Sequence, residues 1–358
     1  MLRGSRVGSR ALRAALMAGA ALAVAHSHGA LAQMTVKLGG YTTFRAATYD
    51  SDAPGATSRE FQNEVEIHVS ADGKADNGLL YGAHIEFEND GGDGAGAGIS
   101  VDEASVYVGG TWGRIELGDH DGASDQLFVY APTVGNGQIE EDWYDFAGPG
   151  IETDDLLLPT DTSDSTKITY MSPVLGGFQA GVSYTPQFDS QGQDVVRFKP
   201  TSPDAENLYK DLIEAGAGYK RDIGPVSLVL GVGYVHGDAN QGTDAEDFDA
   251  WGAGAQIGYE GFTIGGAYND NGDSLIETDE PDAKSWNVGV SYEADDWGVA
   301  AQYQKVDLPG RKINIYGLGA AYEPAPGLTI GPEVIFFDDD DPEVGDGYVA
   351  LIAVNLEF

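Results

Sequence analysis

The sequence predicts an all-β chain that crosses a membrane as an up-and-down barrel of sixteen antiparallel strands. Sixteen short stretches alternate apolar and polar residues, the connections between them alternate in length, and the last stretch ends on the terminal aromatic Phe358. In the stretch 226–235 every second residue is apolar: Val226, Leu228, Leu230, Val232 and Tyr234. Because side chains on a strand alternate between two faces, one face of this stretch is apolar throughout. Segments of about ten residues with this period, separated by turn residues, are typical of a transmembrane β-barrel.

The segment 1–32 is predicted to be a secretory signal peptide, with one barrel domain over 33–358. Four arginines precede an apolar run at 14–25 that is too short to cross a bilayer as a helix, and Ala30-Leu31-Ala32 forms a small-x-small cleavage site. An N-terminal membrane anchor is the alternative. The chain has no cysteine, and a closed barrel needs none because its hydrogen-bond ladder supplies the rigidity.

The charge balance is strongly acidic, with a formal net charge of −39 at pH 7. The segment before residue 33 holds four of the 19 basic residues and no acid, so 15 basic residues face 58 acidic ones in the rest of the chain. Such a surface repels nucleic acid and anionic lipid and attracts cations. Regularly spaced aromatics and 42% hydrophobic content argue against disorder.

Strands are predicted at 34–49, 58–70, 79–89, 100–111, 114–119, 167–171, 178–185, 212–220, 226–236, 248–259, 262–269, 285–293, 297–305, 313–322, 328–337 and 348–358. Short turns at 71–78, 112–113, 172–177, 221–225, 260–261, 294–296 and 323–327 alternate with connections that are mostly longer. A meander with tight turns at one rim and long loops at the other produces this rhythm.

Three observations favour a membrane barrel over a soluble one. The apolar parity is almost free of charge, as a lipid-facing surface requires. The opposite parity holds Gly, Ser, Gln, Glu and Lys, and sixteen strands enclose an aqueous channel that side chains do not fill. Aromatics collect at the short-turn ends, where a membrane–water boundary suits them: Tyr219, Tyr259, Phe262, Tyr292, Trp297, Tyr322 and Phe358. Pro332 lies within a predicted strand, so we expect a bulge or local break there.

The third long connection, about 120–166, is far longer than an ordinary hairpin loop, and loops of this length are commonly functional. It is rich in acidic residues, has no Lys or Arg, and also carries apolar groups such as Leu127, Trp143 and Phe146. A loop that packs its apolar side on the inner wall and shows carboxylates to water satisfies both features. The alternative is a loop folded over the barrel mouth.

This loop and the inward parity of the first strands supply the candidate site. The predicted constriction residues of the loop are Glu140, Glu141, Asp142, Asp145, Glu152, Asp154 and Asp155. The predicted pore-wall residues are Lys37, Tyr41, Arg45, Glu64, Glu66, His68, His84, Glu86 and Lys167. Only three of these wall residues are positive, so we expect a negative field and a preference for cations.

The mature chain resembles the general bacterial outer-membrane porins, specifically the alphaproteobacterial, Rhodobacter-like type. The segment 36–41 (Val-Lys-Leu-Gly-Gly-Tyr) looks like the first strand of that family, and 113–119 (Gly-Arg-Ile-Glu-Leu-Gly-Asp) looks like the segment leading into its third loop. The resemblance implies a homotrimeric diffusion channel in the outer membrane of a Gram-negative bacterium, surrounded by lipid and lipopolysaccharide, with the third loop inside the pore. It also implies calcium among loop carboxylates and a basic wall cluster; the mixed wall described above departs from that cluster.

The expected function is therefore passive diffusion of ions and small hydrophilic solutes, without bond chemistry. The chain holds no Gly-x-Ser-x-Gly, no His-Glu-x-x-His and no cysteine nucleophile, and no cofactor is expected to be required. Alternatives are a substrate-specific channel, for sugars for example, and an acidic β-rich surface adhesin. Calcium is expected at Asp142, Asp145, Asp154 and Asp155, and dense carboxylates at Asp338–Asp341 are a second candidate, because hard cations take oxygen ligands. An acidic loop that is simply solvated is the alternative.

Overall fold

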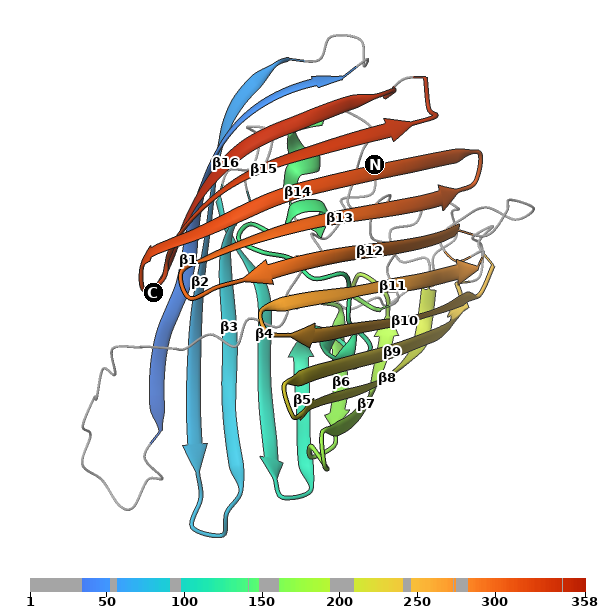
Figure 1. Cartoon of the computed structure of the whole chain (residues 1–358). Helices are drawn as coiled ribbons and strands as arrows, with labels where there is room; N and C mark the ends of the chain where they lie inside the picture. Colours follow the sequence, from blue (N-terminus) through green and yellow to red (C-terminus); the bar gives the residue numbers. More distant parts are fainter. Residues whose placement is uncertain are drawn as a thin grey trace.

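The chain forms one closed barrel of sixteen strands, each antiparallel to both neighbours (Figure 1). The structure is a computed structural model and describes residues 34–51, 57–90, 98–140, 142–147, 161–193, 209–240, 246–272, 274, 283–342 and 344–358. The signal peptide predicted at 1–32 lies outside these residues. Within them, no helix is long and apolar enough to cross a membrane.

All sixteen predicted strands are present, and their ends differ from the prediction by a few residues. The strands are β1 Thr35–Ser51, β2 Arg59–Lys74, β3 Leu80–Asp90, β4 Gly98–Gly110, β5 Gly113–Asp119, β6 Thr166–Met171, β7 Phe178–Gln187, β8 Tyr209–Ile223, β9 Val226–Ala239, β10 Phe248–Tyr259, β11 Phe262–Gly272, β12 Ala283–Glu293, β13 Trp297–Leu308, β14 Arg311–Ala325, β15 Leu328–Asp339 and β16 Gly347–Glu357. Three short 3₁₀ helices, η1 Asp125–Leu127, η2 Gln138–Glu140 and η3 Asp142–Phe146, lie between β5 and β6.

The barrel closes where the first strand meets the last. Phe44 on β1 is the partner of Val354 on β16, and the register continues to Ser51 and Gly347 at the long-loop rim. Beyond the last paired residue, Gly40 and Phe358 exchange backbone hydrogen bonds of 3.1 and 3.0 Å. The terminal aromatic therefore belongs to the closing seam, where closure removes the unpaired strand edges.

The outer face is apolar, as the alternation predicted. On β16, the side chains of Ile352, Val354 and Leu356 are exposed, as is that of Phe358 directly after it, whereas Leu351 and Ala353 on the opposite parity are buried. In a membrane barrel this exposed face lies against lipid.

Aromatic side chains form two rows on this outer face, and only one row was predicted. The row at the short turns includes contacts between Phe262 and Tyr292 (ring centroids 4.6 Å apart) and between Tyr292 and Trp297 (5.4 Å). A second row near the long loops contains Trp251, Tyr268, Trp286, Tyr303, Tyr316, Phe336 and Tyr348, with ring contacts between neighbouring strands. Two such rows are typical of the two membrane–water boundaries.

Pro332 disturbs the ladder without breaking its strand. β15 continues through Pro332, which pairs with Ile352 of β16. On the other side, the pairing with β14 passes from Gly319↔Glu333 directly to Tyr322↔Ile330. The expected local break is therefore confined to the ladder with β14, since proline has no N–H to donate.

Candidate functional site

The third loop lies inside the barrel and follows the inner wall, as predicted. In Figure 1 the green helical segment between β5 and β6 runs within the ring of strands. Hydrogen bonds to inward-facing side chains join the loop to strand after strand: Ala123 N to Ser183 Oγ of β7, Ser124 N to Glu214 Oε1 of β8, Gln256 Nε2 of β10 to Tyr130 O, Ala131 N to Asn287 Oδ1 of β12, Gln302 Nε2 of β13 to Pro132 O, Gln138 Nε2 to Glu333 Oε1 of β15, and Arg45 Nε of β1 to Asn136 Oδ1. The loop therefore narrows the lumen and leaves the wall of β2–β5 facing it.

The apolar side of the loop is packed against the wall. Ile139, Trp143 and Phe146 are buried in one cluster with inward-facing residues of β14–β16 and β1: Tyr49, Ile313, Ile315, Ile335, Phe337, Val349 and Leu351. The ring of Trp143 lies 5.7 Å from that of Phe337. The interleaved apolar residues of the loop thus hold it on the wall by hydrophobic burial. On β14–β16 and β1 the inner face is therefore more apolar than predicted, since Gly, Ser, Gln, Glu and Lys were expected on that face.

Glycines on the inner face make room for the loop. A Cβ at Gly254 would overlap the carbonyl oxygen of Val129, and one at Gly216 would overlap that of Ala123. Loop atoms would also crowd a Cβ at Gly218, Gly231, Gly233, Gly252, Gly289, Gly317 and Gly319. A bare backbone allows this close approach.

Two buried charged residues fasten the base of the loop. Glu214, fully buried on β8, accepts hydrogen bonds from Ser124 N (2.5 Å), Thr162 N (3.1 Å) and Thr162 Oγ1 (2.9 Å), so it holds both ends of the loop. Lys167 donates from Nζ to the carbonyl oxygens of His120 (2.7 Å) and Ser163. Lys167 is on the inner face as predicted but only 2% exposed, so it is a loop anchor and not a positive charge displayed to the lumen.

Burial shifts the pKa of several titratable groups at this base, Asp161 and His120 among them. Desolvation raises the pKa of Asp161 to about 7, and the neighbouring Glu214 carboxylate adds to the rise. Desolvation lowers the pKa of His120 to about 4. The neutral His120 ring suits its partners, because one ring nitrogen lies 2.9 Å from Gly118 O and the other 2.9 Å from Thr169 Oγ1.

The predicted wall residues of β1 and β2 form one hydrogen-bonded network. Arg45 pairs with Glu64 (Nη1 to Oε2, 2.6 Å) and is only 2% exposed. The hydroxyl of Tyr41 donates to Glu64 Oε1 at 2.7 Å and to Glu66 Oε2 at 3.0 Å. Through Arg45 and Asn136 this network reaches the loop.

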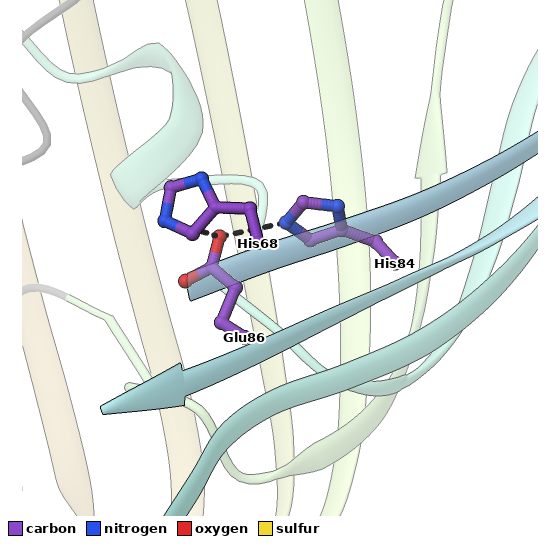
Figure 2. A group of neighbouring side chains, drawn as sticks. All are labelled: His68, His84 and Glu86. Atoms are coloured by element: carbon purple, nitrogen blue, oxygen red, sulfur yellow. Dashed lines mark hydrogen bonds and ion pairs between the residues drawn. The ribbon is translucent and has the colours of Figure 1, made fainter. Parts of the chain in front are cut away.

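Two histidines continue the network onto β3. His68 Nε2 lies 2.5 Å from Glu66 Oε1, and His84 Nε2 lies 2.7 Å from Glu86 Oε1. Figure 2 shows the carboxylate of Glu86 between the two rings. The structure therefore joins seven of the nine predicted wall residues in one network: Tyr41, Arg45, Glu64, Glu66, His68, His84 and Glu86. Lys37 belongs to the neighbouring group described next, and Lys167 lies at the base of the loop.

A second group on this wall lies toward the short turns. Lys37 pairs with Asp72 (3.3 Å), which also accepts a hydrogen bond of 2.7 Å from the hydroxyl of Tyr107. Arg114 pairs with Glu116 (2.8 Å) and stacks over the ring of Tyr107, 4.1 Å from its centroid. Arg114 was not among the predicted wall residues, and the structure puts it on the inner face, paired with a carboxylate.

The acidic residues predicted for the loop are placed only in part. Glu140 is buried in η2 and does not show its carboxylate to the lumen. Asp145 is exposed and accepts a hydrogen bond from Gln62 Nε2 of β2. Glu141, Glu152, Asp154, Asp155 and the side chain of Asp142 lie outside the described residues, so the calcium site predicted at Asp142, Asp145, Asp154 and Asp155 stays a prediction.

Other carboxylates, missed by the sequence analysis, converge at the loop base. Glu103 of β4, Asp121 and Asp164 each bring a carboxylate oxygen within 4.8 Å of the others. Their only signal in the sequence was their acidity, because loop docking brings these distant positions together. In the second calcium candidate, Asp338–Asp341, the carboxylate of Asp339 forms an ion pair with Arg311. The Nε and Nη2 atoms of Arg311 lie 3.0 and 2.6 Å from its oxygens.

A closed membrane barrel with a loop packed inside it is the architecture of a pore-forming protein. A model of the Gram-negative porin family matches residues 13–342, and the chain belongs to this family. This confirms the porin resemblance and makes the chain an outer-membrane porin.

Individual relatives are distant. A mutant of Rh. blastica porin has the same fold, with a TM-score of 0.64 at 18% identity, covering 90% of this chain and 100% of that one. A triple mutant of Rhodopseudomonas blastica porin gives a TM-score of 0.63 at 17% identity with the same coverage. An uncharacterized protein of Rickettsia felis (strain ATCC VR-1525 / URRWXCal2) is 22% identical over 340 residues, which cover 72% of this chain and 76% of that protein.

Proposed function

We propose that this porin is a passive, water-filled diffusion channel for ions and small hydrophilic solutes, and that it prefers cations. The observation that carries the proposal is the charge of the wall facing the loop. On β1–β5, three inward positive side chains, Lys37, Arg45 and Arg114, each lie within ion-pair distance of a carboxylate, and Lys74 has the same parity at the short-turn end of β2. The carboxylates on the same wall are more numerous: Glu64, Glu66, Asp72, Glu86, Asp102, Glu103 and Glu116.

This imbalance favours cations for an electrostatic reason. The Debye length at physiological ionic strength is about 8 Å, so charges of the wall act on ions that pass close to it. Rings of Asp and Glu at a narrow point select cations. The internal loop supports the same sign, because it adds acidic residues and no Lys or Arg between 120 and 166.

The test is the reversal potential of the purified porin in a planar bilayer with a salt gradient. We expect a reversal potential whose sign shows cations as the faster species. In the double variant Glu64→Gln, Asp145→Asn the preference for cations should be weaker. A reversal potential with anions as the faster species would refute the cation preference. Uptake of sugars of increasing size into liposomes separates general diffusion from a substrate-specific channel, since general diffusion falls smoothly with solute size.

We also propose that the barrel assembles as a homotrimer among outer-membrane lipid and lipopolysaccharide. The apolar outer face supports an environment of lipid and neighbouring subunits, and the family resemblance supports the trimer. Chemical cross-linking of the folded porin in detergent should stop at three chains. Cross-linked products that stop at one or two chains would contradict the trimer.

A further inference from the structure

We propose that the pore wall carries a binding site for a divalent transition-metal ion of the zinc class, formed by His68 on β2 with His84 and Glu86 on β3. One ligand atom from each of these three side chains lies within 4.8 Å of the other two. In Figure 2 all three side chains point toward one another, with Glu86 in the middle. The site is separate from the calcium expected in the loop, and it requires no particular ion selectivity of the channel.

The sheet holds the three ligands in place. His68 is the Cα partner of Glu86 across β2 and β3, and Ser70 is the partner of His84, one inward position further along. Directly opposed residues have Cβ atoms about 4.5–5.5 Å apart, so their side chains meet without any movement of the backbone. Ligands that project from strands are positioned more accurately than ligands on loops.

The distances suit one ion. His84 Nε2 lies 2.7 Å from Glu86 Oε1, and His68 Nε2 lies 3.9 Å from the same oxygen. Two ligands of a tetrahedral zinc ion, each about 2.0–2.1 Å from the metal, are about 3.3 Å apart. The observed separations lie on either side of this value, so small rotations of the side chains bring them to it.

The kinds of ligand indicate the class of metal. Imidazole nitrogen suits zinc, copper and nickel, whereas calcium and magnesium take oxygen ligands. Three protein ligands leave a fourth position for water. The side chains of His68 and His84 are 30% and 27% exposed, so this position opens toward the lumen.

An outer partner orients the ring of His84. Ser70 Oγ lies 2.9 Å from His84 Nδ1, and a hydroxyl can accept as well as donate a hydrogen bond. It can therefore accept from a protonated Nδ1 and leave Nε2 free of its proton for the metal, as outer-shell partners do in known sites. Glu66 lies beside the metal position itself, because its Oε1 is 2.5 Å from Nε2 of His68, the same nitrogen that faces Glu86, and the hydroxyl of Tyr41 holds it there.

A β-bulge adds negative charge beside these ligands. Ile85 pairs with Ala104 and Phe87 with Val101, so Asp102 and Glu103 together oppose the single residue Glu86. Asp102 consequently joins Glu66 and Glu86, with carboxylate oxygens of all three within 4.8 Å of one another. Bulges are common next to functional sites, where they redirect a side chain, and the concentrated negative charge attracts a dication.

The experiment is isothermal titration of zinc chloride into the folded porin in detergent, produced without a histidine tag. We expect one zinc ion per chain, unaffected by a large excess of calcium chloride. Ser70→Ala should weaken binding about 10–100-fold, the usual cost of losing an outer partner, and His68→Gln or His84→Gln should weaken it further. His236→Gln is the matched control, because His236 on β9 pairs with Asp249 and takes no part in the site.

Zinc binding that is absent from the wild type, or unchanged in both His68→Gln and His84→Gln, would overturn the proposal. Heat-modifiable migration on a denaturing gel checks that each variant forms a closed barrel. If a variant does not fold, electron paramagnetic resonance of copper(II) added to the wild type gives an independent answer. Coupling to two nitrogens supports the two imidazole ligands, and a spectrum without nitrogen coupling contradicts them.

Discussion

Arg45 on β1 donates a hydrogen bond of 3.3 Å from Nε to Oδ1 of Asn136, 91 residues later in the chain, and so ties the internal loop to the charged wall. The same guanidinium pairs with Glu64 at 2.6 Å and donates to Gln62 Oε1 at 3.0 Å. One positive side chain therefore has two tasks, since it offsets a carboxylate of the wall and holds the loop. Arginine suits both because its planar group carries several donors in fixed directions.

Replacing Arg45 by Gln should increase the cation preference of the channel. The substitution removes a positive charge that is only 2% exposed and takes the ion-pair partner from Glu64, to which Tyr41 still donates a hydrogen bond. It should also lower the free energy of unfolding by up to about 3 kcal/mol. This is the low end of the cost of breaking a buried ion pair, because Glu64 is partly exposed. The reversal potential in a salt gradient and the temperature of heat-modifiable migration are the measurements.

Arg45→Lys separates the effect of the charge from the attachment of the loop, because lysine keeps the positive charge but lacks the several fixed N–H donors of the guanidinium group. We expect near-normal selectivity with a less firmly held loop, seen as noisier single-channel current. Arg221→Gln removes an exposed charge at the short-turn end of β8 and should behave like the wild type. Equal selectivity of Arg45→Gln and wild type would show that this charge does not act on passing ions.

Adding a single methyl group at Gly254 should displace the loop. A Cβ at this position overlaps the carbonyl oxygen of Val129, so Gly254→Ala pushes the loop toward the pore axis and costs about 1–3 kcal/mol of stability. Single-channel conductance and sugar uptake into liposomes should both fall. Ala255→Val enlarges the outward face of the same strand and serves as the control. Unchanged conductance in Gly254→Ala would mean that the loop does not narrow the path.

The strands could be predicted from the sequence because each strand face has a nearly uniform environment over its whole length. The period of two then appears directly in stretches such as 226–235 and 348–358. The β-bulge at Asp102 and Glu103 could not be predicted in this way, since two adjacent polar residues do not show which strand carries the extra one. The second aromatic row is visible in the sequence at Trp251, Trp286 and Tyr348, because the same test that found the first row at the short-turn ends also applies at the long-loop ends.

The site was less predictable than the fold because docking of the loop decides what each inward side chain meets. Lys167 has the right parity for the lumen and is buried only because the two ends of the loop cover it. Glu214 gave no local sign that it holds Ser124 and Thr162. One usable signal was missed: the inward positions of β8–β10 and β14 are repeatedly glycine, which indicates a second backbone lying close against the wall.

Removing calcium should lower the temperature at which the folded porin dissociates or unfolds. A calcium-specific chelator would withdraw an ion held by loop carboxylates, and the trio Glu103, Asp121 and Asp164 has the oxygen ligands that calcium takes. The transition is followed by heat-modifiable migration, with calcium chloride restoring it. Asp121→Asn combined with Asp164→Asn removes ligands of this trio, and Asp142→Asn combined with Asp145→Asn removes ligands of the site predicted in the loop, so one of these two double variants should abolish the effect. His68→Gln combined with His84→Gln should retain it. Indifference of the wild type to the chelator contradicts calcium binding.

The stability of the loop base should depend on pH through Asp161. Its folded-state pKa, raised to about 7 by burial and by Glu214, exceeds the ordinary value of 3.8, so the native state binds the proton more tightly than the unfolded chain does. The corresponding stability is fully present below about pH 4 and is lost as the pH rises through about 7. His120 acts in the opposite direction, because its lowered pKa of about 4 makes its contribution disappear as the pH falls below about 6.5.

Comparison of the wild type with Asp161→Asn isolates the carboxyl group, since His120 is common to both proteins. The amide cannot ionise, so the advantage of the variant over the wild type should grow from pH 5 to pH 8. The measurement is the temperature of heat-modifiable migration at each pH, with Asp76→Asn, an exposed short-turn carboxyl, as the control. The groups facing Asp161 include Glu214, Lys167 and Asp121. If the two curves run parallel across this range, then Asp161 stays in one ionisation state and does not make the stability of the loop base depend on pH.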